Sequence, residues 1–361
     1  MSGSPARIVV GLSGGVDSAV AALRLLERGD DVQGLFMANW DDDDGYCTAA
    51  QDFQDARAVA DLLGIPLHRV DFSQQYRDQV FAHFLAEYTA GRTPNPDVLC
   101  NREIKFGVCL EHARRLGAAR FATGHYAQLH HGADGTELHK GADPARDQSY
   151  FLNSVERAAL ARIEFPVGGL MKAEVRARAR SAGLPVYDKP DSTGICFIGE
   201  RPFREFLARH VGTDPGPIET PEGERLGTHQ GLAFHTLGQR GGLEIGGLAG
   251  HAEGAWYVAR KDTTRNALIV VQGHDHPLLL ARSVTTGPMN WLVAEPRAPF
   301  AASARLRYRQ PDQAVRVTPL ADGGTRLDFD VDQRAATPGQ YAVLYQDTRC
   351  LGGGVIEAVT P

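Results

Sequence analysis

Cysteine is scarce in this sequence of 361 residues, and its distribution argues against disulfide-rich and zinc-binding domains. The five cysteines are Cys47, Cys100, Cys109, Cys196 and Cys350. They are too few and too scattered for a disulfide scaffold, so in a reducing compartment we expect them to be buried, redox-active or metal-binding. No two have the CxxC spacing, so a structural zinc site is disfavoured and we predict no metal site built from them.

Long hydrophobic runs and an excess of positive charge are also missing. No run approaches the ~20 apolar residues needed to cross a bilayer. The opening residues, MSGSPAR, lack the charged-then-apolar pattern of a secretory signal, so we expect a cytoplasmic protein. Lys and Arg number 38 against 44 Asp and Glu, a net charge of −6. This balance argues mildly against nucleic-acid binding, although a local basic surface can sit on an acidic protein.

The chain is longer than one typical domain, and its first half alternates between apolar strands and amphipathic helices. We predict strands at residues 7–12, 32–40, 67–72 and 120–127, and helices at 17–28, 48–63 and 76–88. This alternation predicts an α/β fold with a doubly wound parallel sheet and ligand loops at the carboxyl ends of its strands. We assign this catalytic domain to residues 1–205.

The pattern changes after about Pro202. Residues 212–254 are rich in Gly, Pro and Thr, which predicts a small central domain at 206–276. Short strands at 305–309, 314–317, 325–331 and 341–345 then predict an antiparallel β-barrel at 277–361. The stretch TRLDFDV alternates strictly, so Leu327, Phe329 and Val331 are expected on one face.

A glycine-rich loop, GLSGGVDS at residues 11–18, joins the first strand to the first helix. Its glycines allow a tight turn, and its backbone N–H groups together with the positive helix end form a phosphate cradle. Ser13 and Ser18 add hydroxyl donors, and Asp17 either holds magnesium or orients the loop. The loop matches neither GxxxxGK[ST] nor GxGxxG, which disfavours P-loop NTPases and dinucleotide-binding proteins.

The string SGGVDS at this position resembles the PP-loop of the ATP pyrophosphatases. Those enzymes cleave ATP between its α and β phosphates and form adenylates. The resemblance implies an adenine nucleotide alpha hydrolase-like fold, ATP as a substrate and adenylation as the chemistry. The competing interpretation is a turn between strand and helix that is glycine-rich by chance.

Other segments narrow the choice within that superfamily. Residues 91–106, GRTPNPDVLCNREIKF, place Asp97 three positions before Cys100, and residues 191–200, DSTGICFIGE, contain Cys196. With the strings at 124–126, 140–152, 231–240, 307–309 and 350–354, they closely resemble the bacterial tRNA-specific 2-thiouridylases, the MnmA family. The likeness extends over nearly the whole chain.

Two cysteines and one carboxylate suit the chemistry that this resemblance implies. A uracil carbonyl oxygen is a poor leaving group until adenylation turns it into the oxygen of AMP. Sulfur then has to arrive as a strong nucleophile, which a cysteine persulfide supplies, and a second thiol breaks the S–S bond. Function therefore depends on the fold bringing two distant thiols to one activated carbonyl above the nucleotide loop.

The resemblance also implies a role for individual residues. Cys196 would carry the persulfide, Cys100 would be the nucleophile or resolving thiol, and Asp97 the general acid/base. A Cys100–Cys196 disulfide would close each turnover. The expected ATP-binding residues are Gly11, Leu12, Ser13, Gly14, Gly15, Val16, Asp17, Ser18, Met37 and Gly124. The expected tRNA contacts, of which the first three touch the target base, are Asn95, Pro96, Asp97, His125, Arg146, Asp147, Gln148, Arg307, Tyr308 and Gln340.

The implied partners are tRNA and a sulfur donor. The tRNAs would be those for Lys, Glu and Gln, thiolated at the wobble uridine with ATP and magnesium, and the target base would be flipped into the pocket. The donor would be a cysteine desulfurase or a relay protein. Three rival functions stay open: an amidating or lysidine-type ligase, a non-catalytic nucleotide- or RNA-binding module, and 4-thiouridine formation.

Several of these residues also have a purely structural interpretation. We expect Cys109 and Cys350 to be core residues, and we assign no role to Cys47. Arg307 and Tyr308 are neighbours on a predicted strand, so they would point to opposite faces. Two interpretations stay open: both contact tRNA, or one of them is only solvated.

Overall fold

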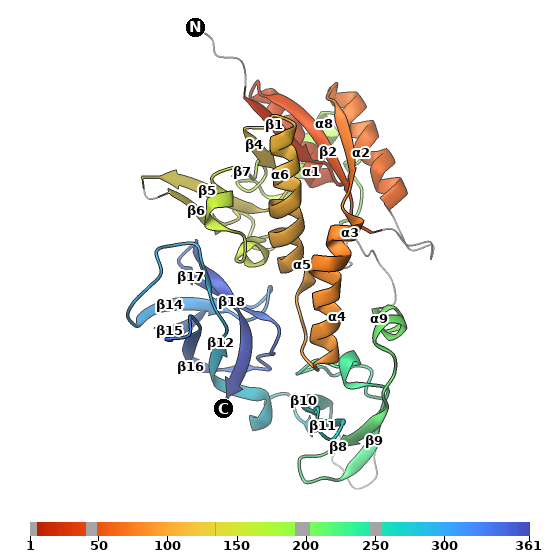
Figure 1. Cartoon of the computed structure of the whole chain (residues 1–361), viewed down its shortest axis with the longest axis vertical. Helices are drawn as coiled ribbons and strands as arrows, with labels where there is room; N and C mark the ends of the chain where they lie inside the picture. Colours follow the sequence, from red (N-terminus) through yellow and green to blue (C-terminus); the bar gives the residue numbers. More distant parts are fainter. Residues whose placement is uncertain (1–5, 41–48, 134, 192–202, 246–253) are drawn as a thin grey trace.

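A five-stranded parallel sheet organises the first part of the chain in the computed structural model, which describes residues 6–40, 49–133, 135–191, 203–245 and 254–361 (Figure 1). Its order is β3-β2-β1-β4-β7, with every neighbouring pair parallel. The strands are β1 Arg7–Gly11, β2 Asp31–Ala38, β3 Leu67–Asp71, β4 Arg120–Ala122 and β7 Ile163–Glu164. The predicted parallel sheet is confirmed.

Helices cover both faces of this sheet, because the strand residues alternate between two hydrophobic clusters. One face packs against α1 Val16–Glu27, α2 Ala49–Leu63 and α8 Lys172–Ser181. The other packs against a longer series: α3 Ser73–Tyr76, η1 Arg77–Phe81, α4 Ala82–Thr89, α5 Pro96–Leu99, η2 Cys100–Cys109, α6 Leu110–Arg115, η3 Ser149–Leu152 and α7 Arg157–Leu160. The sheet is therefore doubly wound, as predicted.

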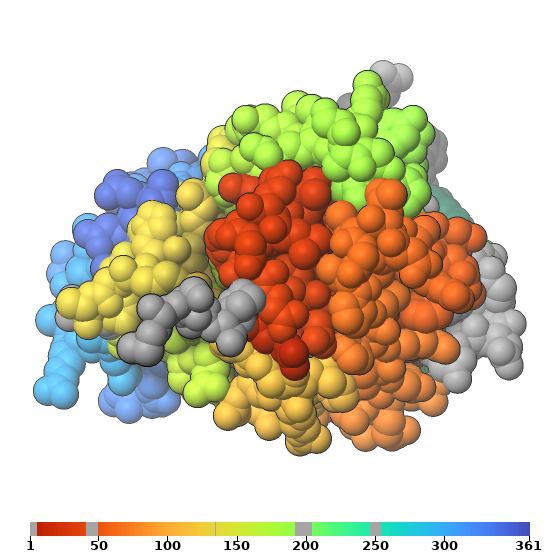
Figure 2. Space-filling view, turned by 90° about the horizontal axis from the view of Figure 1, so that it is seen from above, coloured from red at the N-terminus to blue at the C-terminus, as the bar shows by residue number. Residues whose placement is uncertain are grey.

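The fourth strand is shorter than the predicted 120–127. It stops at Ala122, and the chain then turns through Thr123–His125 before entering a hairpin of β5 Ala127–Gly132 and β6 Gly135–Lys140. The hairpin leaves the parallel sheet and reaches the carboxyl-terminal barrel, where His139 of β6 pairs with Arg349 of β18. Figure 2 shows the hairpin, in yellow, lying directly against the blue barrel.

A small four-stranded sheet of order β10-β11-β8-β9 forms the central part. Helix α9 Phe203–Val211 precedes it, and its core contains Ile218, Trp256 and Val258. The strands and short helix are β8 Gly216–Glu219, β9 Arg225–His229, η4 Leu232–Phe234, β10 Trp256–Asp262 and β11 Ala267–Gln272. We predicted a separate small domain here, but its boundaries at 205/206 and 276/277 stay a prediction.

The last part is a closed antiparallel barrel, which confirms the prediction from the strand pattern. Six strands follow one another as β12-β16-β15-β14-β17-β18, and β18 pairs with β12 to close the ring. The elements are η5 Pro277–Leu279, β12 Leu280–Thr286, β13 Asn290–Trp291, β14 Phe300–Arg305, β15 Gln313–Pro319, β16 Thr325–Arg334, β17 Tyr341–Gln346 and β18 Arg349–Thr360. Closure removes the exposed edges of the sheet.

Two details of the predicted barrel strands are wrong. Strand β14 ends at Arg305, and the next residues form a turn in which Gln310 accepts a hydrogen bond from the Leu306 N–H at 2.8 Å. Arg307 and Tyr308 therefore lie in a turn and not on opposite faces of a strand. Val331 is 66% exposed and does not share a face with Leu327 and Phe329.

The exposure of Val331 follows from the strand register. Ser283 pairs with Asp328 and Ala281 pairs with Gln333, so β16 has three more residues than β12 across this step. The excess bulges out of the ladder and carries Val331 away from the core. Among the described residues, no helix is long and apolar enough to cross a membrane.

Substitution at this bulge gives a direct check of the barrel register. Phe329→Ala should lower the free energy of unfolding by about 3–5 kcal/mol, because it opens a cavity in the barrel core. Val331→Ala, two positions away, should change it by less than about 0.5 kcal/mol. Urea unfolding of both variants measures the difference, and equal losses would show that the bulge is misplaced.

Candidate active site

The glycine-rich loop is held in shape by its own hydroxyls and by the neighbouring helix α2. Ser18 Oγ accepts a hydrogen bond from the Ser13 N–H at 3.2 Å and donates one to the Gly15 carbonyl at 2.9 Å. Gly14 has φ 76° and lies against the Asp52 backbone, so a side chain at this position would clash. The first turn of α1 has no side-chain cap, which leaves its N–H groups available to an anion.

Lys189, which does not belong to the loop, connects it to helix α2. Its ammonium group donates to the Gly14 carbonyl at 3.0 Å and pairs with Asp52 at 2.7 Å and Asp55 at 2.5 Å. Burial alone would lower the pKa of Lys189, but the hydrogen bonds and charges of these carboxylates raise it above its ordinary value. The ammonium therefore stays charged and joins the loop to α2.

A second lysine holds Asp17. Lys172 is 8% exposed, and its Nζ lies 2.7 and 2.8 Å from the two Asp17 oxygens and 2.7 Å from Asp191. The Tyr126 hydroxyl donates to Asp17 at 2.7 Å. Burial alone would raise the pKa of Asp191, but the hydrogen bond from Lys172 and the charges of Lys172, Arg146 and Arg176 hold it below its ordinary value. Asp17 therefore sits in a network joining the loop, the segment between β4 and β5, and α8.

The ends of β1, β2 and β4 meet beside this loop at the carboxyl edge of the sheet. A Cβ atom at Gly124 would lie 2.6 Å from the Ser18 nitrogen, so only glycine lets this strand end pack on the first turn of α1. Met37 packs over Gly11, where its Cε would lie 3.7 Å from an added Cβ. The structure thus brings together the predicted nucleotide residues from three segments. Leu12 and Val16 are buried, so only their backbones are available to a ligand.

Asp97 and Cys100 lie on consecutive turns of one helical segment on the other side of the sheet. Asn95 caps it by accepting a hydrogen bond from the Val98 N–H at 3.4 Å, and Pro96 occupies its first turn. From Cys100 the helix continues as a π-helix, a form often found at functional sites. Cys100 is 0% exposed and shares a hydrophobic cluster with Val9 and Met37, whereas Asp97 is half-buried.

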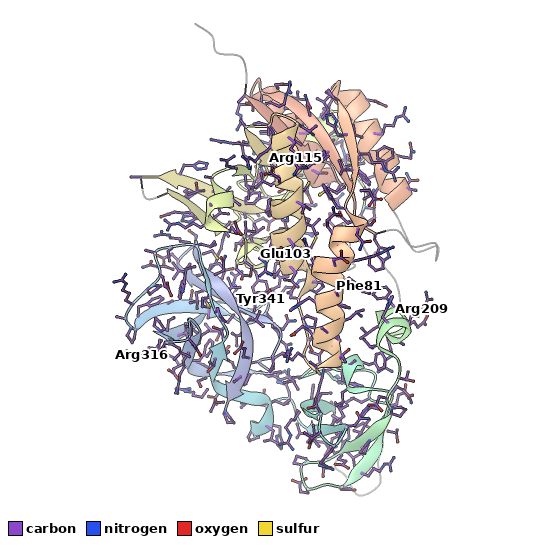
Figure 3. All side chains as sticks on the ribbon, in the orientation of Figure 1. Phe81, Glu103, Arg115, Arg209, Arg316 and Tyr341 are labelled. Atoms are coloured by element: carbon purple, nitrogen blue, oxygen red, sulfur yellow. The ribbon has the colours of Figure 1, made fainter. Side chains whose placement is uncertain are left out.

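The barrel supports this segment. Gln340 Nε2 donates to the Thr93 carbonyl at 2.8 Å and to the Pro94 carbonyl at 3.2 Å, and the Thr93 N–H donates to Pro338. Figure 3 shows the same junction further along, with Tyr341 of the barrel beside the helix that carries Glu103. Gln340, a predicted tRNA contact, therefore holds the loop in front of Asn95 and Asp97.

The predicted tRNA residues fall into two environments. Arg146, Asp147 and Tyr308 line one cavity of ≈ 480 Å³, together with Pro144, Ala145, Arg305 and Arg309. Asp147 is buried and pairs with Arg305 at 2.9 Å, while Arg146 pairs with Asp191 at 2.7 Å. Residues about 160 positions apart along the chain are thus brought to one hollow.

The remaining predicted tRNA residues make internal contacts in this structure. His125 is 9% exposed between the rings of Phe106 and Phe165, and burial, with the charge of Lys105, lowers its pKa well below 6.5. Gln148 accepts a hydrogen bond from the Tyr126 N–H at 3.0 Å. Arg307 donates to the carbonyls of Leu237 and Ala335, at 3.1 and 2.8 Å, and so joins the central sheet to the barrel.

The four cysteines other than Cys100 form two groups. Cys109 and Cys350 are fully buried, and burial raises the pKa of each thiol, which confirms them as core residues. Cys196, the predicted persulfide carrier, and Cys47 lie outside the described residues. The predicted Cys100–Cys196 pairing therefore stays a prediction.

Comparison with known proteins matches three family models along the chain. They are described as a tRNA methyl transferase HUP domain at residues 6–200, a tRNA methyl transferase PRC-barrel domain at 204–272 and an aminomethyltransferase beta-barrel domain at 281–356. A protein of Hahella chejuensis named tRNA-specific 2-thiouridylase MnmA is 55% identical over 98% of both chains. A protein of the same name from Marinobacter nauticus is 56% identical over 98% of this chain and 92% of its own. The chain belongs to the tRNA-specific 2-thiouridylase family.

Four residues of this family member's site were not predicted from the sequence: Lys172, Lys189, Arg305 and Arg309. Lys172 meets Asp17 across 155 positions, and only the fold brings these two residues together. Arg309 could have been noticed, because the string RYR places it directly after Tyr308. Arg309 forms no ion pair with any residue in the described part of the chain.

The glycine-rich loop provides only some of the ligands that a magnesium ion needs. One carboxylate, with phosphate oxygens and water, is a donor set that magnesium accepts. Both oxygens of Asp17, however, are bonded to Lys172, and one also to Tyr126. No group of three metal-binding side chains occurs among the described residues.

The close packing of Gly124 on α1 predicts a selective effect on nucleotide binding. Gly124→Ala should weaken ATP binding at least about tenfold, because the new methyl group pushes the first turn of α1 out of place. Gly169→Ala is the control, since its Cβ would lie 4.0 Å from its nearest neighbour. Calorimetric titration with ATP measures both, and unchanged affinity in Gly124→Ala would contradict the site.

Proposed function

We propose that this protein is a tRNA-uridine 2-sulfurtransferase that uses ATP to thiolate the wobble uridine of the tRNAs for Lys, Glu and Gln. The observation that carries the proposal is the placement of Asp97 and Cys100 on one helical segment, with Cys100 in the hydrophobic cluster that also contains Met37, which packs against Gly11 of the glycine-rich loop. The names of the full-length relatives support the same reaction. The donor of sulfur would be a cysteine desulfurase or a relay protein.

The first step would be activation of the base. The O2 oxygen of uracil attacks the α-phosphorus of ATP, pyrophosphate leaves, and Asp97 takes the N3 proton. The uncapped N–H groups of α1 and the hydroxyls of Ser13 and Ser18 would hold the phosphates. Lys172 is the nearest cation to Asp17, so it would offset phosphate charge as the nucleotide enters.

The second step would deliver sulfur. The terminal sulfur of a Cys196 persulfide attacks C2, and AMP leaves with the original oxygen. The Cys100 thiolate then attacks the Cys196 sulfur, which forms the Cys100–Cys196 disulfide and releases 2-thiouridine. An external thiol reductant restores both cysteines before the next turnover.

The cavity between the catalytic domain and the barrel would receive part of the tRNA. Arg146, Arg305 and Arg309 surround it, which provides local positive charge on a protein of net charge −6. Arg305 already pairs with Asp147, and Arg146 with Asp191, so among these three arginines the proposal depends most on the charge of Arg309. The Tyr308 ring lies 4.4 Å from that of Phe151, centroid to centroid, and forms an aromatic surface on which a base can stack.

The reaction can be tested with ATP, magnesium, tRNA for Glu and a chemically persulfidated enzyme, followed by mass spectrometry of the nucleosides. The wild type should produce 2-thiouridine. Cys100→Ala should reduce its yield at least about 1000-fold while pyrophosphate release on adding tRNA persists. Cys109→Ala, which removes a thiol from the same cluster, should leave the yield near wild type. A fully active Cys100→Ala would favour an amidating or lysidine-type ligase, and a 4-thiouridine product would identify that rival.

The RNA-binding cavity predicts an electrostatic signature. Arg309→Ala should weaken tRNA binding about 3- to 10-fold and reduce the slope of log Kd against log salt by about 1, because one phosphate contact is lost. Arg316→Ala is the matched control, an exposed arginine on the outer side of the same barrel (Figure 3). Filter binding over a salt series measures both, and equal slopes in the two variants would count against this cavity.

A further inference from the structure

Asn39 is a buried amide without a partner. It directly follows β2, is 2% exposed, and neither its Oδ1 nor its Nδ2 has a hydrogen-bond partner. No other asparagine or glutamine among the described residues is buried with both amide atoms unpaired. Asn153, for comparison, donates to the Tyr150 carbonyl at 2.6 Å and accepts from the Ser154 hydroxyl at 2.9 Å.

Such an amide destabilises the protein by itself. Water lost from both polar atoms is not replaced, whereas a leucine of nearly the same shape would fill the space at no such cost. Buried polar groups are almost always satisfied, so an amide left open at the ligand edge of a parallel sheet points to a ligand that completes it.

The position of Asn39 puts it on the side of the sheet that carries the thiol helix. Met37 and Trp40, on either side of it in sequence, both belong to the hydrophobic cluster that contains Cys100. The Phe72 N–H donates to the Ala38 carbonyl at 2.7 Å, so β2 still pairs with its neighbour just before Asn39. Trp40 packs on Phe81 and Phe206, 4.9 and 6.1 Å between ring centroids; Figure 3 labels Phe81 on this side of the molecule.

The chemistry of a side-chain amide selects the kind of ligand. It offers one donor and one acceptor side by side in a plane, which matches the edge of a nucleobase. Uracil presents the N3–H donor next to the O4 acceptor, and these pair with Oδ1 and Nδ2 of asparagine. The nucleotide loop and Gly124 surround the phosphate side of the site. Asn39 follows Met37 by two residues on the same strand face, and Met37 lies both against Gly11 of that loop and in the hydrophobic cluster that contains Cys100.

We propose that Asn39 is a positioning residue that holds the target uracil before activation, with Oδ1 accepting from N3–H and Nδ2 donating to O4. The N3 proton passes to Asp97 only when O2 attacks ATP, and the hydrogen bond to O4 holds the base after that. The inference rests on the proposed function. In this arrangement O2, on the far side of N3, faces the nucleotide. The flipped base would then supply the two hydrogen bonds that the Asn39 amide lacks. The unpaired amide lowers the stability of the protein, and this loss would be offset when the base binds.

The test is Asn39→Leu, which keeps the shape and removes both polar atoms. We expect its thermal midpoint to be equal to or above that of the wild type, its ATP affinity to change by less than about twofold, and its kcat/KM for tRNA thiolation to fall at least about 100-fold. Asn153→Leu is the matched control for a satisfied buried amide, and its midpoint should fall. Asn39→Asp keeps the acceptor but loses the donor to O4, so its thiolation should be reduced as well.

Two results would overturn the inference. Thiolation by Asn39→Leu within threefold of wild type would show that the amide does not hold the base. A loss of ATP affinity parallel to the loss of thiolation would assign Asn39 to adenine instead. A wild-type enzyme that forms no 2-thiouridine under the same conditions would reject the proposed function itself, which separates that failure from this one.

Discussion

The shared ammonium group of Lys172 is the interaction on which the nucleotide site depends. It lies between the carboxylates of Asp17 and Asp191, almost out of contact with water. Without it, two carboxylates would face each other in a partly buried site. Their repulsion would destabilise the folded protein far more than the same two charges would on an exposed surface. The lysine therefore connects the first turn of α1 to α8 and to the segment that carries Asp191. Lys189 does the same for Gly14 and α2, so the loop is formed before any ligand arrives.

The barrel has a second, less obvious part in the site. The barrel contacts the loop directly before the segment that carries Asp97. Gln340 donates hydrogen bonds to the carbonyls of Thr93 and Pro94, and the Pro338 carbonyl accepts one from the Thr93 N–H. Gly339 packs against the Thr93 backbone. A Cβ atom at Gly339 would lie 2.9 Å from the Thr93 backbone, so this contact requires glycine. The barrel, which lines the proposed RNA-binding cavity, is thus joined by hydrogen bonds to the loop that precedes Asp97. A tRNA seated against the barrel would also bear on the position of Asp97.

Local features were predictable from the sequence, and features created by the meeting of distant segments were not. The glycine-rich loop lies within eight residues, and the parallel sheet follows from alternating patterns, so both could be predicted. Leu327 and Phe329 followed the strand alternation, but Val331 did not, because the bulge depends on the length of the partner strand. The turn at Arg307 was predicted as a strand, because the residue pattern at 305–309 is typical of a strand. Lys172 could not be assigned at all, since its partner is 155 positions away.

Burial of Cys100 limits how any reaction at this thiol can proceed. Its side chain is 0% exposed and lies in the hydrophobic cluster that also contains Val98, Leu99 and Ile104. In the proposed reaction Cys100 has to meet a second sulfur atom, and the π-helical geometry of η2 would make a rearrangement there easier than in an α-helix. In a π-helix each backbone hydrogen bond joins residues five apart, whereas in an α-helix it joins residues four apart. The hydrogen bonds can therefore shift by one residue, which rotates the preceding side chains without unfolding the helix. The same burial keeps the thiol away from adventitious oxidants. A site that is rigid at the phosphates and adjustable at the thiol would suit the proposed two-step reaction, because activation needs a fixed nucleotide and sulfur transfer needs a second group to approach afterwards.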